Sequence, residues 1–401
     1  MLRKLLAGLG ASALAATVMT AQAPAQPQAP AQPPGGAQGR AGAPGAAGGG
    51  RGNANLPTEE QWAAMSPKAK EYVEKAKAIA GTDPELMFDF GIFCKASGGS
   101  QNPDRATVGV PNSEPKLQPF PAPSPAQVIG GQRLFDNFYW IGNTGIGVWL
   151  VTSNDGYIMF DTMNSEDDAK NIIIPAMEKL KLDPMKIKYL VFGHHHFDHT
   201  GGGQYIQKLT GAKAVMGRDD WELYLKSTGR GGGGRGRGRG AEGASESATP
   251  PPPPQPVAPL PKMTRDIDAT DGMTLKVGDV TATVFQMTGH TPGSIGMVVP
   301  VKFQGRQHPI LLVTAGTDVR NREAFVGGYE HIWDEAIKMK AEAVYQSHPN
   351  TNMNLLARTK YVNDNFPPAK NPLLYGAART EKYINIMRNC TLARMEILGW
   401  Q

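Results

Sequence analysis

The sequence predicts an α/β fold in which strands and helices pack in layers, and three observations support this prediction. Short runs rich in β-branched and aromatic residues, bounded by turn residues, occupy 137–142, 146–152 and 157–162. A segment whose apolar residues recur at helical spacing, 165–182, separates them from the next strand-like run, 187–192. Histidine-containing turns directly follow three strand-like runs, which is typical of functional loops on a rigid scaffold.

The first residues have the pattern of a secretory signal. Basic residues within 1–4 precede an apolar run, 5–20, and the small residues Ala21-Gln22-Ala23. We therefore expect residues 1–25 to be removed and the mature protein to be secreted or periplasmic, with no membrane span. The apolar run is short for a transmembrane helix, so an uncleaved anchor is the minor alternative, and the cleavage point within 21–25 stays open.

Residues 26–125 are expected to lie outside the main domain. Ala, Pro, Gln and Gly dominate 26–55, which should form a disordered leader because it has almost no apolar surface to bury. Residues 56–125 are expected to form a helical extension that packs on the main domain. Ser66-Pro67 and Asp83-Pro84 are helix-start signals, and Gly81 should end the first helix.

Charge and cysteine content limit the function classes. A net charge of +5 is a modest excess for 401 residues, so we expect no specific nucleic-acid partner. Cys94 and Cys390 are the only cysteines. In an exported chain such a pair can form a disulfide between the extension and the C-terminal helix, with two free thiols as the alternative.

The main domain, 126–401, is expected to begin with a β-layer. Asn154-Asp155-Gly156 is a hairpin-turn signal, and Asp161 ends the strand that follows it. The helix over 165–182 and the strand over 187–192 come next. A second helix over 204–209 and a strand over 212–216 are also expected.

The strongest functional signal is the stretch His194-His195-His196-Phe197-Asp198-His199, an H-x-H-x-D-H cluster directly after a strand-like run. Imidazole nitrogens and carboxylate oxygens suit zinc. The spacing allows His194 and His196 to face one ion while Asp198 and His199 face another. The alternative is a solvated histidine-rich loop.

Two later histidines argue against a solvated loop. His290 lies in Gly289-His290-Thr291-Pro292-Gly293 and follows the strand-like run 282–287. His348 lies in Ser347-His348-Pro349 and follows the run 343–345. Each histidine again stands where a strand gives way to a turn.

These three motifs, in this order, resemble those of the metallo-β-lactamase superfamily over Ala126–Gln401. Their flanks are most similar to the third subclass of metallo-β-lactamases, which has only His and Asp zinc ligands. The resemblance implies a four-layer αββα sandwich and two zinc ions per chain. By position, the first ion would be held by His194, His196 and His290, and the second by Asp198, His199 and His348. His195, His308 and His331 are left without a metal role.

The resemblance also implies the chemistry. Two metal ions would share a hydroxide that attacks a carbonyl, with Asp198 as the catalytic residue that helps to deliver a proton to the leaving group. Asp161 matches a buried acid that supports the metal loop by hydrogen bonding. An ordinary turn residue is the alternative for Asp161, and ligand type alone does not exclude iron or manganese.

Two segments depart from the resembled subclass. Residues 229–262 are an insertion of Arg-Gly and Pro-rich sequence, expected to be disordered, with polymer binding as the alternative to a solvated linker. In Val313-Thr314-Ala315-Gly316-Thr317-Asp318, Thr317 falls where the subclass presents a hydroxyl residue, so the resemblance implies a substrate contact there. The departure comes next, because Asp318-Val319-Arg320-Asn321 replaces the subclass's serine-containing turn that grips a substrate carboxylate. Arg320 is expected to bind a substrate carboxylate, against a plain surface role. Asp318 is either a solvated loop acid or a metal-bridging carboxylate.

The sequence thus predicts an exported zinc hydrolase that opens the amide of a β-lactam ring in a small-molecule substrate. A hydrolase of lactones or other cyclic esters or amides is the first alternative. A non-catalytic zinc-binding or polymer-binding protein is the second. The oligomeric state is open.

Overall fold

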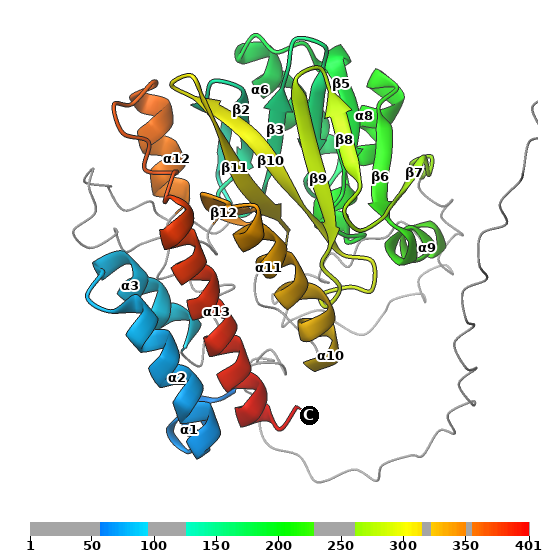
Figure 1. Ribbon diagram of the computed structural model, residues 1–401. Coiled ribbons are helices and arrows are strands. Elements are labelled where there is room, and N and C mark those ends of the chain that lie inside the picture. Colours follow the sequence, from blue (N-terminus) through cyan, green and yellow to red (C-terminus); the bar gives the residue numbers. More distant parts are fainter. Residues whose placement is uncertain (1–56, 95–125, 228–260, 315–321, 350–354, 401) are drawn as a thin grey trace, which may run out of the picture. The chain divides into compact units, whose positions relative to one another are not determined.

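The computed structural model describes residues 57–94, 126–227, 261–314, 322–349 and 355–400, all of which belong to one compact unit. Within these residues the strands form a seven-stranded sheet and a five-stranded sheet (Figure 1). The first sheet contains, in spatial order, β1 (Val128–Phe135), β2 (Phe138–Asn143), β3 (Gly147–Thr152), β4 (Tyr157–Phe160), β5 (Ile187–Val191), β6 (Lys213–Gly217) and β7 (Ile267–Ala269). The second contains β12 (Ala343–Gln346), β11 (Arg306–Val313), β10 (Ile295–Phe303), β9 (Val280–Gln286) and β8 (Thr274–Val277).

Helices precede and connect the strands. They are α1 (Glu59–Ala63), α2 (Pro67–Ala80), α3 (Pro84–Phe93), α5 (Glu166–Asp168), η1 (Ala169–Ile173), α6 (Ile174–Lys179), η2 (Pro184–Lys186), α7 (Phe197–Thr200), α8 (Gly203–Thr210), α9 (Arg218–Lys226), α10 (Arg322–Ala324), η3 (Phe325–Glu330), α11 (His331–Lys338), α12 (Leu355–Asp364) and α13 (Ala377–Leu398). In the first sheet, β4, β5, β6 and β7 run parallel to one another. The carboxyl ends of these strands therefore lie at one edge of the sheet, where ligands bind in α/β folds.

The two sheets pack face to face. Trp149 of β3 stacks on Tyr345 of β12 with ring centroids 5.1 Å apart, and both belong to one buried cluster drawn from both sheets. Strand β2 is buried along its whole length, which requires cover on both faces of its sheet. Ile173 and Met177, from η1 and α6, and Ile206 of α8 cover the outer face of the first sheet.

The outer face of the second sheet is covered by α11 and α13. Ile332 and Trp333 of α11 share a cluster with Val298 of β10 and with Tyr383 of α13. The order of layers is therefore helix, sheet, sheet, helix, and the predicted αββα sandwich is confirmed.

The helices α2 and α3 of the N-terminal extension pack against α13 (Figure 1). Ser66 and Asp83 cap α2 and α3, as predicted, and Gly81 ends α2. Phe93 meets Tyr383 edge to face at 5.7 Å. The predicted disulfide between Cys94 and Cys390 is confirmed, and it joins the end of α3 to α13 with the two Cα atoms 4.8 Å apart.

The helix predicted over 165–182 is interrupted. One π-helical turn, η1, lies between α5 and α6, and Pro175 occupies the first turn of α6. Proline has no N–H to donate, and its ring excludes the usual carbonyl partner four residues earlier. The backbone before Pro175 therefore takes the wider hydrogen-bonding pattern of a π-helix, in which each bond spans five residues.

Several predictions lie outside the described residues. They concern the signal over 1–25, the leader over 26–55, the part of the extension over 95–125, most of the insertion over 229–262, and Thr317, Asp318 and Arg320. Among the residues that the structure describes, no helix is long and apolar enough to cross a membrane.

Candidate metal centre

The loop after β5 presents four of the predicted ligands. His194 and His196 lie on the bend that joins β5 to the short helix α7, and His196 directly precedes that helix. Asp198 and His199 lie on α7 itself. The sequence predicted a loop over all four, so the helical turn of α7 is a difference. Because residues 198 and 199 follow each other on a helix, their side chains leave the backbone in different directions, and both still reach the cluster.

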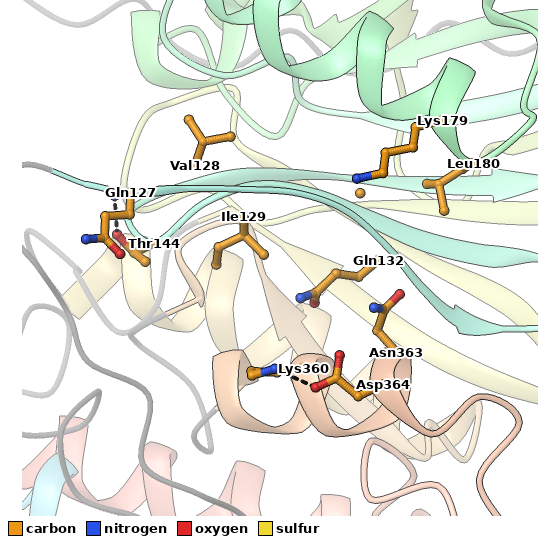
Figure 2. A pocket seen from close by; sticks show the side chains of 11 residues that line it. Gln127, Val128, Ile129, Gln132, Thr144, Lys179, Leu180, Lys360, Asn363 and Asp364 are labelled. Atoms are coloured by element: carbon orange, nitrogen blue, oxygen red, sulfur yellow. Dashed lines mark hydrogen bonds and ion pairs between the residues drawn. The ribbon is translucent and has the colours of Figure 1, made fainter.

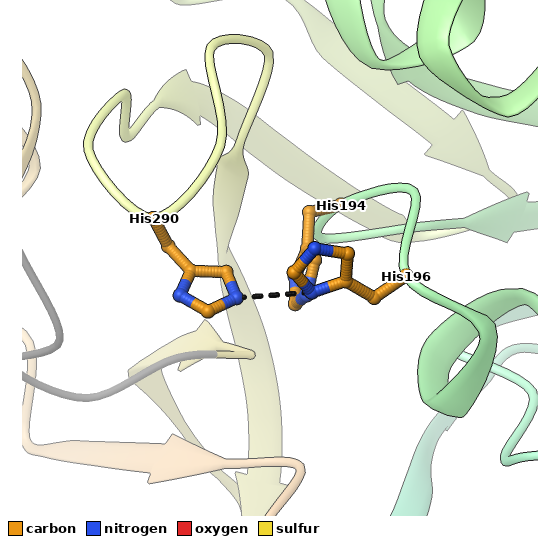
Figure 3. Close-up of side chains that lie close together, drawn as sticks. All are labelled: His194, His196 and His290. Atoms are coloured by element: carbon orange, nitrogen blue, oxygen red, sulfur yellow. Dashed lines mark hydrogen bonds between the residues drawn. The ribbon is translucent and has the colours of Figure 1, made fainter. Parts of the chain in front are cut away.

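The first ligand set consists of His194, His196 and His290. Figure 3 shows the three rings converging, with His290 entering from the separate loop after β9. His194 Nε2 lies 3.0 Å from His196 Nδ1, and His290 Nε2 lies 3.1 Å from the same atom. Three imidazole nitrogens from two loops thus point at one location.

The second ligand set consists of Asp198, His199 and His348. Asp198 Oδ2 lies 3.4 Å from His199 Nε2 and 3.4 Å from His348 Nε2. His194 is close to both sets, because its ring centroid lies 4.3 Å from that of His199. The structure therefore brings all six predicted ligands together.

The ring nitrogens that face away from the cluster are held by acceptors of the protein. His199 Nδ1 donates to Asp161 Oδ2 at 2.8 Å, and His348 Nδ1 donates to the carbonyl of Gly145 at 3.0 Å. His194 Nδ1 lies 2.9 Å from Thr314 Oγ1. Such outer contacts fix the tautomer and the direction of each ring, as in protein metal sites.

Asp161 is buried and serves three partners at once. Besides His199, its carboxylate accepts the backbone N–H of Gly193 at 3.1 Å and the hydroxyl of Ser347 at 2.5 Å. Its φ of 66° is in the left-handed region, which is strained for a residue with a side chain. The prediction that Asp161 supports the metal loop is confirmed by these contacts.

Asp220 was missed by the sequence analysis. This buried residue of α9 accepts the backbone N–H of His195 at 3.0 Å, the hydroxyl of Thr291 at 2.6 Å and the backbone N–H of Gly293 at 3.1 Å. It thus ties the loop of His194 and His196 to the loop of His290. The available signal was an acidic pair, Asp219-Asp220, directly after a predicted strand.

Close packing in the same region depends on glycine at one point. A Cβ on Gly193 would lie 2.0 Å from Thr314 Cγ2. The absence of a side chain at Gly193 lets Thr314 reach the ring of His194. Thr314 therefore supplies a hydroxyl to the metal centre, a role that the sequence analysis did not assign to it.

The electrostatics differ between the two ligand sets. Burial and the neighbouring histidines lower the pKa of His196 to about 4 and hold the pKa of His194 well below its usual value. Burial alone would also lower the pKa of His199, but the charges and hydrogen bonds of Asp161 and Asp198 raise it to about 10. Hydrogen bonds from His199 and His348 outweigh burial at Asp198 and hold its pKa below the usual range.

The three remaining histidines do not join the cluster, as predicted. The Nδ1 atom of His195 lies 3.3 Å from Asp220 Oδ1. His308 pairs with Glu342 and His331 with Asp271.

The donor set fits metal binding. Five imidazoles and a carboxylate converge from three chain segments. The ligand atoms of His194, His196 and His290 lie within 4.8 Å of one another, and so do those of His194, Asp198 and His199. His348 adjoins the second group through Asp198. The lowered pKa values of His194 and His196 keep these two imidazoles neutral, so each presents a lone pair that a divalent cation accepts.

Comparisons with known proteins agree with this fold. A family model described as the metallo-beta-lactamase superfamily matches residues 142–302. A hydroxyacylglutathione hydrolase of Maricaulis maris is 31% identical over 108 residues, which are 27% of this chain and 27% of that protein. The matched segment is thus about a quarter of the curated relative.

Solved structures show the same architecture over more of the chain. A subclass B3 metallo-beta-lactamase of Bradyrhizobium japonicum superposes with a TM-score of 0.50 and 24% identity, covering 65% of this chain and 90% of its own. A metallo-beta-lactamase from Legionella gormanii gives a TM-score of 0.52 and 17% identity, covering 68% of this chain and 98% of its own. At these identities the likeness is one of fold.

Proposed function

We propose that this chain, whose residues 142–302 match the metallo-beta-lactamase superfamily model, is an exported zinc hydrolase that opens the amide of a β-lactam ring. The observation that carries the proposal is the convergence of two ligand sets made only of His and Asp. In the proposal, His194, His196 and His290 hold one ion, and Asp198, His199 and His348 hold the other.

The bound metal pair would supply Lewis acidity toward the scissile carbonyl and a hydroxide nucleophile at neutral pH. The protein holds the ligands in place through Asp161, Thr314, Asp220 and the carbonyl of Gly145. Asp198 keeps its carboxylate ionised at neutral pH, so it can accept a hydrogen bond from water, and in the proposal it helps to deliver a proton to the leaving nitrogen.

The surroundings suit a small organic substrate. Phe197, between His196 and Asp198, is 40% exposed although it is a large apolar residue. An apolar surface beside convergent polar groups is the usual composition of a small-molecule site. The proposed substrate contacts through Thr317 and Arg320 remain predictions.

Export is part of the proposal. The disulfide between Cys94 and Cys390 supports it, because such bonds persist mainly in oxidising compartments. N-terminal sequencing of the protein from a periplasmic extract should give a first residue within 22–26. An intact Met1 in that fraction would argue for an uncleaved anchor.

The second candidate function is hydrolysis of a lactone or thioester. It is favoured by the match to a hydroxyacylglutathione hydrolase, which at 31% is more similar in sequence over its short span than the structural neighbours are. Both candidates use the same metal centre, so only substrate comparison separates them.

The test is initial-rate hydrolysis by the purified mature chain with penicillins, carbapenems, acyl-lactones and hydroxyacylglutathione, each with added zinc or with a chelator. Chelator-sensitive turnover of a β-lactam is expected, and its absence alongside turnover of another class would replace the first candidate by the second. Bound zinc without turnover of any class would leave a zinc-binding protein. The matched control is His308→Ala, which removes a histidine outside the cluster.

A further inference from the structure

Outside the metal centre, a cavity lies at the edge of the seven-stranded sheet that β1 forms. None of the six predicted metal ligands lines it. Its volume is about 520 Å³, within the size range of small-molecule sites. Its lining includes Gly131 and Gln132 of β1, Lys179 at the end of α6, and Lys360, Asn363 and Asp364 of α12. Figure 2 shows strand β1 crossing the cavity, with α12 on one side and the end of α6 on the other.

Gln132 presents a buried polar atom to this cavity. The residue is 5% exposed, and its Oε1 has no hydrogen-bond partner among the described residues. A buried polar group without a partner is costly, so a ligand that supplies the partner recovers a large part of that cost.

The edge of β1 offers further hydrogen-bonding groups. The backbone N–H of Arg133 points away from β2 and donates to Asn363 Oδ1 at 3.0 Å. Alternate residues of a strand face the same way, and the pairing with β2 is regular from Gly131 to Arg133. Gly131 therefore turns its N–H and C=O toward the same open edge, inside the cavity.

The charged groups in the cavity favour an anion. Lys360 is paired with Asp364 at 2.5 Å. Lys179 lies on the other side of the strand (Figure 2) and forms no ion pair with any residue that the structure describes. One lysine is thus available to a carboxylate of a ligand.

We propose that this cavity, which we call the β1-edge site, binds a small peptide-like acid that carries both an amide N–H and a carboxylate. The amide N–H donates to Gln132 Oε1, the carboxylate pairs with Lys179, and the amide carbonyl faces the N–H of Gly131. This proposal does not depend on the reaction at the metal centre.

The probe is N-acetylglycine, the smallest molecule that carries both groups. Titration into the isotope-labelled, zinc-loaded mature chain is followed by NMR at the side-chain amide of Gln132, which is assigned by its loss in Gln132→Leu. Acetate lacks the amide, and N-acetylglycinamide lacks the carboxylate. We expect N-acetylglycine to shift the Gln132 amide at lower concentration than either partial probe.

The variants separate the β1-edge site from carboxylate binding at zinc. Gln132→Leu and Lys179→Met should each weaken the effect of N-acetylglycine about tenfold, read at the backbone amides of Gly131 and Asn363. The matched control, Lys208→Met, changes an exposed lysine of α8 and should bind as the wild type does. Gln132→Leu should unfold at the same or a higher temperature, because it removes an unpaired buried atom.

Two results would overturn the proposal. One is an unshifted Gln132 amide at saturating N-acetylglycine. The other is wild-type binding by Lys179→Met, whose exposed position makes loss of folding no explanation.

Discussion

Replacement of Asp220 by Asn tests whether one buried carboxylate holds the first ligand set together. The side chain keeps its shape, but it offers one oxygen and one NH₂ group in place of two oxygens. If the remaining oxygen faces His195 and Thr291, the NH₂ group meets the N–H of Gly293, which is then a buried donor without an acceptor.

The magnitude follows from these three bonds. An unpaired buried N–H costs about 1–3 kcal/mol, and loss of charge on the other two bonds adds about 1 kcal/mol. We expect the free energy of unfolding to fall by about 2–4 kcal/mol. Thr291 and Gly293 belong to the same turn as His290, so the zinc affinity of the first set should fall about 10- to 100-fold.

The assay combines urea unfolding of the zinc-free chain with competition for zinc against a coloured chelator. Asp219→Asn is the matched control, since it makes the same charge change at an exposed neighbour on α9. Equal zinc affinity and equal stability of the Asp219→Asn and Asp220→Asn proteins would refute the assignment of Asp220 as the link between the two loops.

Three further predictions follow from the same geometry. His196→Ala should remove the ligand shared by both short contacts of the first set, so metal analysis after dialysis should find at most one zinc per chain; two retained ions would contradict the assignment. Asp161→Asn should weaken the second zinc about 10- to 100-fold in the chelator competition, because His199 loses its charged acceptor, and an unchanged second affinity would count against that role. Cys94→Ser should lower the free energy of unfolding by up to about 5 kcal/mol, since the disulfide closes a loop of 296 residues, and reduction of the wild type should reproduce the loss; equal urea midpoints in the two redox states would disprove it.

The metal ligands could be predicted because each lies in a local sequence pattern. His194, His290 and His348 follow strand-like runs, and the spacing within the first motif encodes two directions of approach. The caps of α2 and α3 are equally local, since Ser66 and Asp83 act on their own helices. Such local structure can be predicted from the sequence because the neighbouring residues alone determine it.

The parts that escaped prediction depend on contacts between distant segments. Asp220 meets Thr291 across 71 residues of sequence, and the acidic pair alone does not tell buried Asp220 from its exposed neighbour Asp219. Strand β1 is rich in glycine and polar residues, so its pattern did not indicate a strand, although pairing with β2 makes it one. In both cases a tertiary contact decides the outcome.

The position of Asp161 has a consequence for the order in which the molecule becomes functional. Its carboxylate accepts hydrogen bonds from Gly193 and His199, which follow β5 of the first sheet, and from Ser347, which follows β12 of the second sheet. The complete cluster therefore exists only after the two sheets have docked. Ions that bind the complete cluster then favour the folded chain by mass action, so metal supply raises the stability of the docked state.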